Sequence, residues 1–136
     1  MIALSIRQPW AWMILHAGKD IENRDWPTAF VGRCLLHAGL TMTRAEYAAG
    51  RDVLRAIHGP KFDLPPADEL RRGGIVGSVV IRDCVLNSNS PWFAGPFGFQ
   101  LVEPWPCPFT PLKGRLQFFN APKMELLPPC EAARSS

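Results

Sequence analysis

Proline is distributed along this chain in a way that limits how long its helices can be. Fourteen of the 136 residues are proline, and most of them lie in the second half of the chain. Inside a helix, proline removes a backbone hydrogen bond and its ring clashes with the preceding turn. Eleven glycines add further break points. This pattern favours short strands and tight turns over long helices.

Apolar segments between these breaks predict about six strands and two helices. The strongest strand signal is residues 74–86, which are rich in β-branched apolar side chains. Pro9 and Gly18 suit the two ends of a first helix over 10–17, and a capping box at 43–46 begins a second helix that continues to about residue 57. The other strands are expected at 2–6, 20–26, 33–38, 97–102 and 115–119, with loops at 61–73 and 87–96.

The order of these elements, β-α-β-β-α-β-β-β, decides between fold classes. Strands and helices do not alternate regularly, which disfavours a doubly wound parallel sheet. We expect a mixed α/β fold in which about six strands curl into a small β-barrel, with the two main helices packed at its ends. The length suits one domain, which we place at residues 1–122. The tail, 123–136, is expected to be partly disordered.

Charge, cysteine spacing and hydropathy exclude several classes of protein. The formal charge of +3 does not by itself imply nucleic acid, although it is compatible with a local basic cleft. The four cysteines form no C-x-x-C pair and the three histidines complete no zinc spacing, so reduced thiols are expected, with no metal and no cofactor. No signal-peptide pattern and no apolar run of about 20 residues occurs. We expect a soluble cytoplasmic protein without a membrane partner.

Polar residues interrupt the core-forming sequence of the first thirty positions. If 20–26 is a strand, Glu22, Arg24 and Trp26 share one face at intervals of about 6.5–7 Å. Lys19 lies in the turn before that strand, so the alternation does not constrain it. A lysine, a carboxylate and a guanidinium could therefore converge at one mouth of the barrel. The alternative from spacing alone is an ion-pair network at the rim, where such pairs are common and contribute little stability.

The predicted loop at 87–96 and the start of the next strand are unusually aromatic. Ser90, Trp92, Phe93 and Phe97 lie between turn-forming residues. Loops of this composition often hold ligands. The alternative is that the aromatic side chains only close one end of the barrel.

Several segments occur in the order found in a known family. They are Leu4–Ala11 (LSIRQPWA), Gly18–Trp26 (GKDIENRDW), Gly32–Ala38, Gly74–Cys84, Ser90–Phe99 and Pro111–Gly114 (PLKG). Together they resemble the ASCH domain of the PUA-like superfamily, over roughly residues 2 to 120. The family pattern G-x-K-x-x-E-x-R is present with one residue fewer before the lysine.

The resemblance implies a β-barrel related to RNA-binding PUA domains, with its site in the cleft between the barrel and the first helix. Members are thought to bind RNA or DNA. One branch hydrolyses the acyl amide of N4-acetylcytidine with a lysine and a threonine of this motif and a later glutamate. Lys19 occupies the lysine position, but Glu22 stands at the threonine position. Because a carboxylate cannot replace a hydroxyl nucleophile in that mechanism, the mechanism does not carry over.

The function favoured by these observations is binding of RNA, single-stranded DNA or a nucleotide. Cationic side chains would contact phosphates, aromatic side chains would stack on an unpaired base, and other polar groups would hydrogen-bond the base edge. The phosphate contacts are assigned to Lys19, Arg24, Arg7 and Lys113, the stacking to Trp26, Trp92 or Phe93, and the edge contacts to Gln8 or Glu22.

Two other functions remain open at this point. A hydrolase acting on a modified nucleoside, or a ribonuclease, would use Glu22 as general base, with Lys19 and Arg24 stabilising the negative charge that develops. Ser90 is a substitute nucleophile without an identifiable partner base. A protein-interaction adaptor would use the helix at 43–57 and the proline-rich tail.

Overall fold

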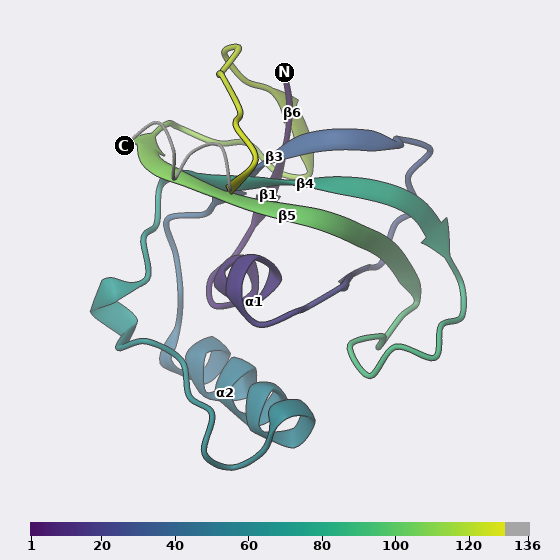
Figure 1. Cartoon of the computed structure of the whole chain (residues 1–136), viewed down its shortest axis with the longest axis vertical. Coiled ribbons are helices and arrows are strands. Elements are labelled where there is room, and N and C mark those ends of the chain that lie inside the picture. Colours follow the sequence, from purple (N-terminus) through teal and green to yellow (C-terminus); the bar gives the residue numbers. More distant parts are fainter. Residues whose placement is uncertain (130–136) are drawn as a thin grey trace.

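The computed structural model describes residues 1–129, which form a curled six-stranded sheet with two α-helices on its concave side (Figure 1). The strands are β1 (Ile2–Ile6), β2 (Ile21–Arg24), β3 (Gly32–Ala38), β4 (Gly74–Val85), β5 (Phe97–Pro111) and β6 (Phe118–Asn120). The helices are α1 (Trp10–His16) and α2 (Arg44–His58), followed by the short 3-10 turn η1 (Ala67–Glu69). The predicted mixed α/β class is confirmed.

The sheet is a half-barrel with the strand order β2-β5-β4-β3-β1-β6. Only β1 and β3 run parallel, and the other neighbouring strands are antiparallel. The long strands β4 and β5 change register three times along their pairing. Such bulges bend a strand and increase its twist, so they account for the curl of the sheet.

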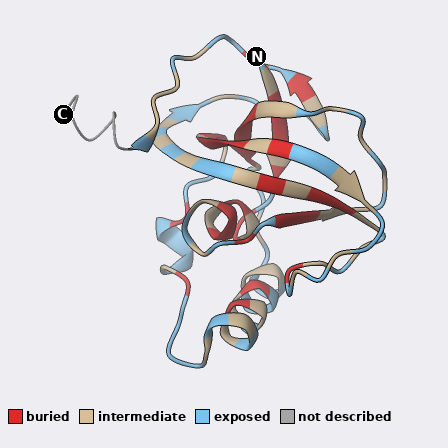
Figure 2. Cartoon of the chain, turned by 45° about the vertical axis from the view of Figure 1, so that its right-hand side comes forward, coloured by how far each residue is buried: buried red, intermediate tan, exposed pale blue. Residues whose placement is uncertain are grey.

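Helix α1 lies against the concave face of the sheet and closes the core. Its side chains Ala11 and Ile14 pack with the fully buried Leu36, Val79 and Phe99 of the strands. Figure 2 shows buried residues both on α1 and on the strands beside it. The left-handed conformation of Gly18 (φ +74°) follows the helix, as the sequence predicts.

Helix α2 packs over α1 as an outer layer, and it meets the sheet at Ile21 of β2, which belongs to the same apolar cluster as Leu54 of α2. Met13 of α1 and Leu54 of α2 share one apolar cluster. The helices approach closely because Gly50 has no side chain: a Cβ there would lie 2.3 Å from the Cγ of Pro9. The predicted capping box is present, since the Thr43 and Glu46 side chains each accept a hydrogen bond from the other's backbone N–H.

Strand β5 is much longer than the segment 97–102 predicted for it. It continues to Pro111 through Pro104, Pro106 and Pro108. β2 pairs only with residues 97–100, so the outer edge of β5 beyond that point has no neighbouring strand in the described part of the chain. Proline is tolerated on such an edge because its missing N–H is not needed there. The last strand is also displaced, to Phe118–Asn120 from the predicted 115–119.

The start of the predicted tail contacts the domain. Met124 and Leu126 pack against the second apolar cluster, which is built around Leu35, Ile75 and Phe119. Residues 130–136, the second half of the predicted tail, lie outside the described residues. No helix among residues 1–129 has the length and apolar character needed to cross a membrane.

Candidate functional site

A pocket of about 340 Å³ lies where the end of α1, strand β2, helix α2 and the 87–96 loop meet. It is lined by Trp10, Lys19, Glu22, Asn23, Val53, Pro91, Trp92, Phe93 and Ala94. The lining joins aromatic and apolar side chains to a buried lysine and a buried glutamate. A concave, mostly apolar surface with a few polar groups is typical of a small-ligand site.

Lys19 is buried, with only 4% of its surface exposed. Gly18 turns the chain at the end of α1, and the Lys19 backbone N–H then bonds to the carbonyl of Met13. Its Nζ donates to the carbonyl oxygen of Ile21 and to Oε1 of Glu22, the second at 3.1 Å. An ammonium group has three protons. One donor of Lys19 is therefore left for a ligand.

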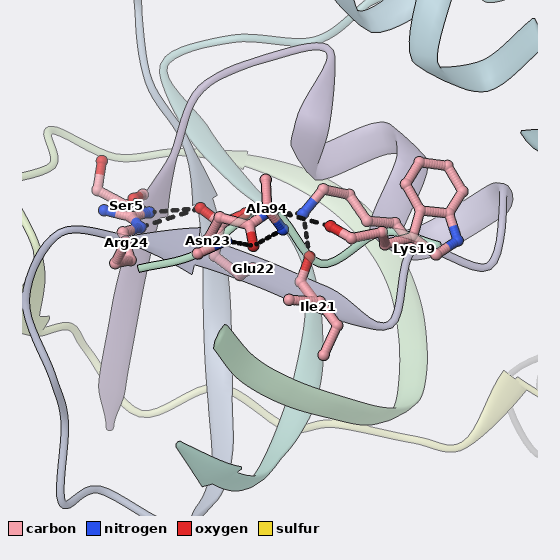
Figure 3. Close-up of polar contacts among 9 residues, drawn as sticks. Ser5, Lys19, Ile21, Glu22, Asn23, Arg24 and Ala94 are labelled. Carbon is pink, nitrogen blue, oxygen red and sulfur yellow. Dashed lines mark hydrogen bonds and ion pairs between the residues drawn. The ribbon is translucent and has the colours of Figure 1, made fainter. Parts of the chain in front are cut away.

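Glu22 bridges two cations, as Figure 3 shows. Its Oε1 accepts from Lys19, while its Oε2 accepts from Nε of Arg24 at 3.0 Å and lies 2.9 Å from Nη2. Nη2 of Arg24 also donates to the carbonyl of Ser5 at 2.7 Å. The ion-pair network inferred from spacing is thus present, and two of its three members line the pocket.

Asn23 attaches the 87–96 loop to β2, a role that the sequence analysis missed. Its Nδ2 donates to the carbonyl of Trp92 at 3.0 Å (Figure 3 shows the Asn23–Ala94 side of this contact). Its Oδ1 accepts from the backbone N–H groups of Ala94 and Gly95, at 2.8 and 3.1 Å. Asparagine is uncommon in strands, so its presence in this predicted strand was the one sign in the sequence that Asn23 has a special role. The contact fixes the aromatic wall of the pocket.

Two of the three aromatic residues predicted to stack on a base lie at the pocket, and the third does not. Trp92 and Phe93 line the pocket. Trp26 does not, because β2 ends at Arg24 and the strand alternation ends with it. Its ring packs edge-on against Phe99 and Phe118, with centroids 5.2 and 5.7 Å apart. The structure therefore places Trp26 beside the core.

Gln8 and Ser90 lie outside this pocket. Gln8 is buried and lines a different cavity, where its Nε2 donates to the carbonyl of Arg71 and its Oε1 accepts from the N–H of Trp12. Ser90 donates to Oδ1 of Asp20 at 2.5 Å and lines a smaller polar hollow.

Lys113 and Arg7 are also remote from the pocket lining. Lys113 borders a shallow hollow beside His37, whose Nε2 lies 2.6 Å from the carbonyl oxygen of Leu112. Arg7 pairs with Glu46 at the start of α2. The structure thus brings together Lys19, Glu22, Trp92 and Phe93, and separates them from Gln8, Trp26, Ser90 and Lys113. Arg24 contacts the group through Glu22.

Comparison with known proteins places this architecture in a family. The ASCH domain family model matches residues 4–94, a range that includes every residue lining the pocket. The chain belongs to the ASCH domain family. It is also similar to activating signal cointegrator 1 of Mus musculus, with 29% identity over 83 residues. That match covers 60% of this chain and 14% of the mouse protein, so the chain spans only a small part of that relative.

The described part of the chain contains no group of side chains arranged to bind a metal ion. Among residues 1–129, no three His, Cys, Asp or Glu side chains are grouped so that they could hold a metal ion. Cys34, Cys84 and Cys107 are free thiols. The polar side chains that line the pocket are those of Lys19, Glu22 and Asn23, and the Asn23 amide already bonds the 87–96 loop.

Proposed function

We propose that this ASCH domain binds an unpaired base of RNA or single-stranded DNA, or the same base as a free nucleoside or nucleotide, in the pocket beside Lys19. The observation that carries the proposal is the pairing of aromatic walls with a buried Lys19–Glu22 contact in one cavity. The family's association with RNA binding supports the same ligand class.

The hydrogen-bonding groups of the pocket suit the edge of a base. Lys19 has one unused donor, and Oε1 of Glu22 has one unused lone pair, because Lys19 is its single side-chain partner. These groups are 3.1 Å apart. Unpaired bases present a hydrogen-bond acceptor next to a donor on their Watson–Crick edge, which RNA-binding domains commonly recognise. The lysine and the glutamate would each make one such bond.

The size and the walls of the pocket also fit a single base. Its volume of about 340 Å³ is at the lower end of the range for ligand pockets, about 300–1,000 Å³. Phe93 and Trp10 supply aromatic surface. Stacking on an aromatic side chain stabilises a bound base by about 1–3 kcal/mol.

Arg24 has a different role in this proposal from the phosphate contact expected at first. Its guanidinium group already binds Glu22 and the carbonyl of Ser5. Arg24 is therefore a positioning residue, which holds the carboxylate of Glu22 in place.

The test is the affinity of Phe93→Ala for short RNA and DNA homopolymers and for free nucleosides. Removing one stacking ring should weaken binding by about 5- to 150-fold, the equivalent of about 1–3 kcal/mol. Phe62→Ala is the matched control, because Phe62 is 54% exposed and does not line the pocket. Fluorescence anisotropy and isothermal titration would measure both variants. Wild-type affinity in Phe93→Ala would show that the base does not bind here.

A hydrolase acting on a modified nucleoside, or a ribonuclease, is the second candidate. It is favoured by the direct contact of Lys19 with Glu22 inside a cavity. Both oxygens of Glu22 already accept hydrogen bonds from cations, which suits an orienting group better than a general base. Chromatography of the ligands recovered from the same titrations separates the two functions. Free cytidine from an N4-acylcytidine, or cleaved RNA, would favour the enzyme.

A further inference from the structure

A second cavity, of about 390 Å³, lies on the other side of α1 from the base pocket. Successive residues of a helix are rotated by about 100°, so Trp10 and Trp12 project from nearly opposite faces of α1. Trp10 lines the first pocket and Trp12 lines the second. Leu15 and His16 of α1 and the preceding Gln8 also line the second cavity, and its other walls come from the segment 69–71 and from strands β4 and β5.

Arg71 is the cation of this second cavity. Its guanidinium carbon lies 4.7 Å from the ring centroid of Phe109, and no ion pair forms between Arg71 and a carboxylate of the described residues. Its backbone is fixed, because the buried Gln8 donates from Nε2 to the Arg71 carbonyl at 3.0 Å. The structure therefore holds an exposed guanidinium group over an aromatic ring at the edge of a cavity.

The other polar groups of the cavity are better suited to binding a ligand than to catalysing a reaction. Desolvation lowers the pKa of His16, so its imidazole is neutral near pH 7 and offers one donor and one acceptor. Burial raises the pKa of Cys107, which keeps its thiol protonated and a poor nucleophile. Glu69 supplies a carboxylate at the same cavity.

We propose that this second cavity binds a further nucleotide of the strand whose base occupies the first pocket. Arg71 binds its phosphate, Trp12 and Phe109 supply aromatic surface for its base, and Glu69 accepts a hydrogen bond from a base N–H. The strand crosses α1, a helix of about 10–12 Å diameter with its side chains. This inference rests on the proposed base-binding function and extends it from one base to a strand.

The test compares Arg71→Gln with Arg72→Gln, its matched control. Arg72 is the adjacent exposed arginine and lines a separate hollow at the start of α2. We expect Arg71→Gln to weaken binding of a short RNA or DNA homopolymer by about tenfold and to reduce the slope of log K against log salt by about 0.7, the value for one phosphate contact on a single strand. Arg72→Gln should change each quantity much less. The affinity for a free nucleoside should stay at the wild-type value in both variants.

The other possible results distinguish a failure of the second site from a failure of the proposed base-binding function. Equal effects of Arg71→Gln and Arg72→Gln on the homopolymer would overturn the second site and leave the first intact. The same conclusion follows if Arg71→Gln binds the homopolymer like the wild type, or if it weakens nucleoside binding as much as homopolymer binding. If the wild-type protein binds neither homopolymer nor nucleoside, both the proposed function and this extension are wrong. The Arg71 side chain is exposed and its backbone contact with Gln8 does not involve the guanidinium group, so the variant should fold, which circular dichroism would verify.

Discussion

Two carboxylates in this protein each bridge two cations, one in the interior and one at the surface. Glu22 lies between Lys19 and Arg24, whose side chains are 3% and 18% exposed. Asp63 lies between Arg51 and Arg55, and all three of these side chains are about 40% exposed. The ion-pair distances are similar, from 2.9 to 3.1 Å in the four contacts. The two clusters therefore differ mainly in their contact with water.

This difference in exposure gives the two clusters different roles. Around Asp63, water solvates the charges and the ion pairs add little, but the cluster ties the segment after α2 back to that helix, next to the buried Leu64. Around Glu22, the charges of Lys19 and Glu22 have been removed from water, that of Arg24 partly so, and each depends on its partners. A buried charged cluster contributes less to stability than its contacts suggest. Its place in the pocket agrees with the binding role proposed for it.

The largest effect is expected from Glu22→Gln. The substitution leaves the buried Lys19 and the partly buried Arg24 without their shared counter-charge and sets the new amide N–H₂ group against a cation. Breaking a buried ion pair by removing one partner costs about 3–5 kcal/mol. Urea denaturation followed by tryptophan fluorescence should show this loss as a lower midpoint. A stability change as small as that of a surface variant would mean that water reaches the cluster freely.

Arg24→Gln should have an intermediate effect. It removes the two contacts with Oε2 of Glu22 and the bond to the Ser5 carbonyl, but Glu22 keeps Lys19 as a partner. Hydrogen bonds to charged groups contribute about 1.5–3 kcal/mol each, and the partial exposure of Arg24 reduces the net loss toward the lower value. The same urea titration measures it. A loss equal to that of Glu22→Gln would indicate that Arg24, and not Lys19, compensates the carboxylate.

Asp63→Asn should have the smallest effect, and this effect should depend on pH. Partial desolvation opposes ionisation of Asp63, but the Leu64 N–H and the two arginines outweigh it and lower the pKa of the carboxyl below 3.8. Because the folded-state pKa is depressed, the stabilisation is present above about pH 4 and is lost as the pH falls through the folded-state pKa. Urea midpoints of wild type and variant should differ slightly at neutral pH and converge in acid. A difference that grows in acid would contradict this assignment.

The features that form within one short segment of the chain could be predicted well from the sequence. The capping box at Thr43 and Glu46 depends on residues three apart, and the Lys19–Glu22–Arg24 cluster depends on a single turn and strand. Each can be recognised within one short segment. The curled mixed sheet also followed from the irregular order of its elements.

Features that depend on distant partners could not be predicted in this way. Asn23 has its role only because the loop around Trp92, about seventy residues later, lies beside it. Trp26 lies outside the predicted site because β2 ends two residues earlier, and its ring packs instead against Phe99 and Phe118. The division of the polar residues between two cavities depends on where α1 lies relative to the sheet.

The prolines of β5 also restrict the ways in which this domain can associate with other proteins. An unpaired strand edge ordinarily accepts another strand, either from an extended peptide or from a second copy of the chain. Pro104, Pro106 and Pro108 have no N–H to donate along that edge. Strand addition and edge-to-edge aggregation are therefore disfavoured there. Partners of this part of the sheet must be recognised through side chains, as the second cavity, which Pro106, Cys107 and Phe109 line, would do.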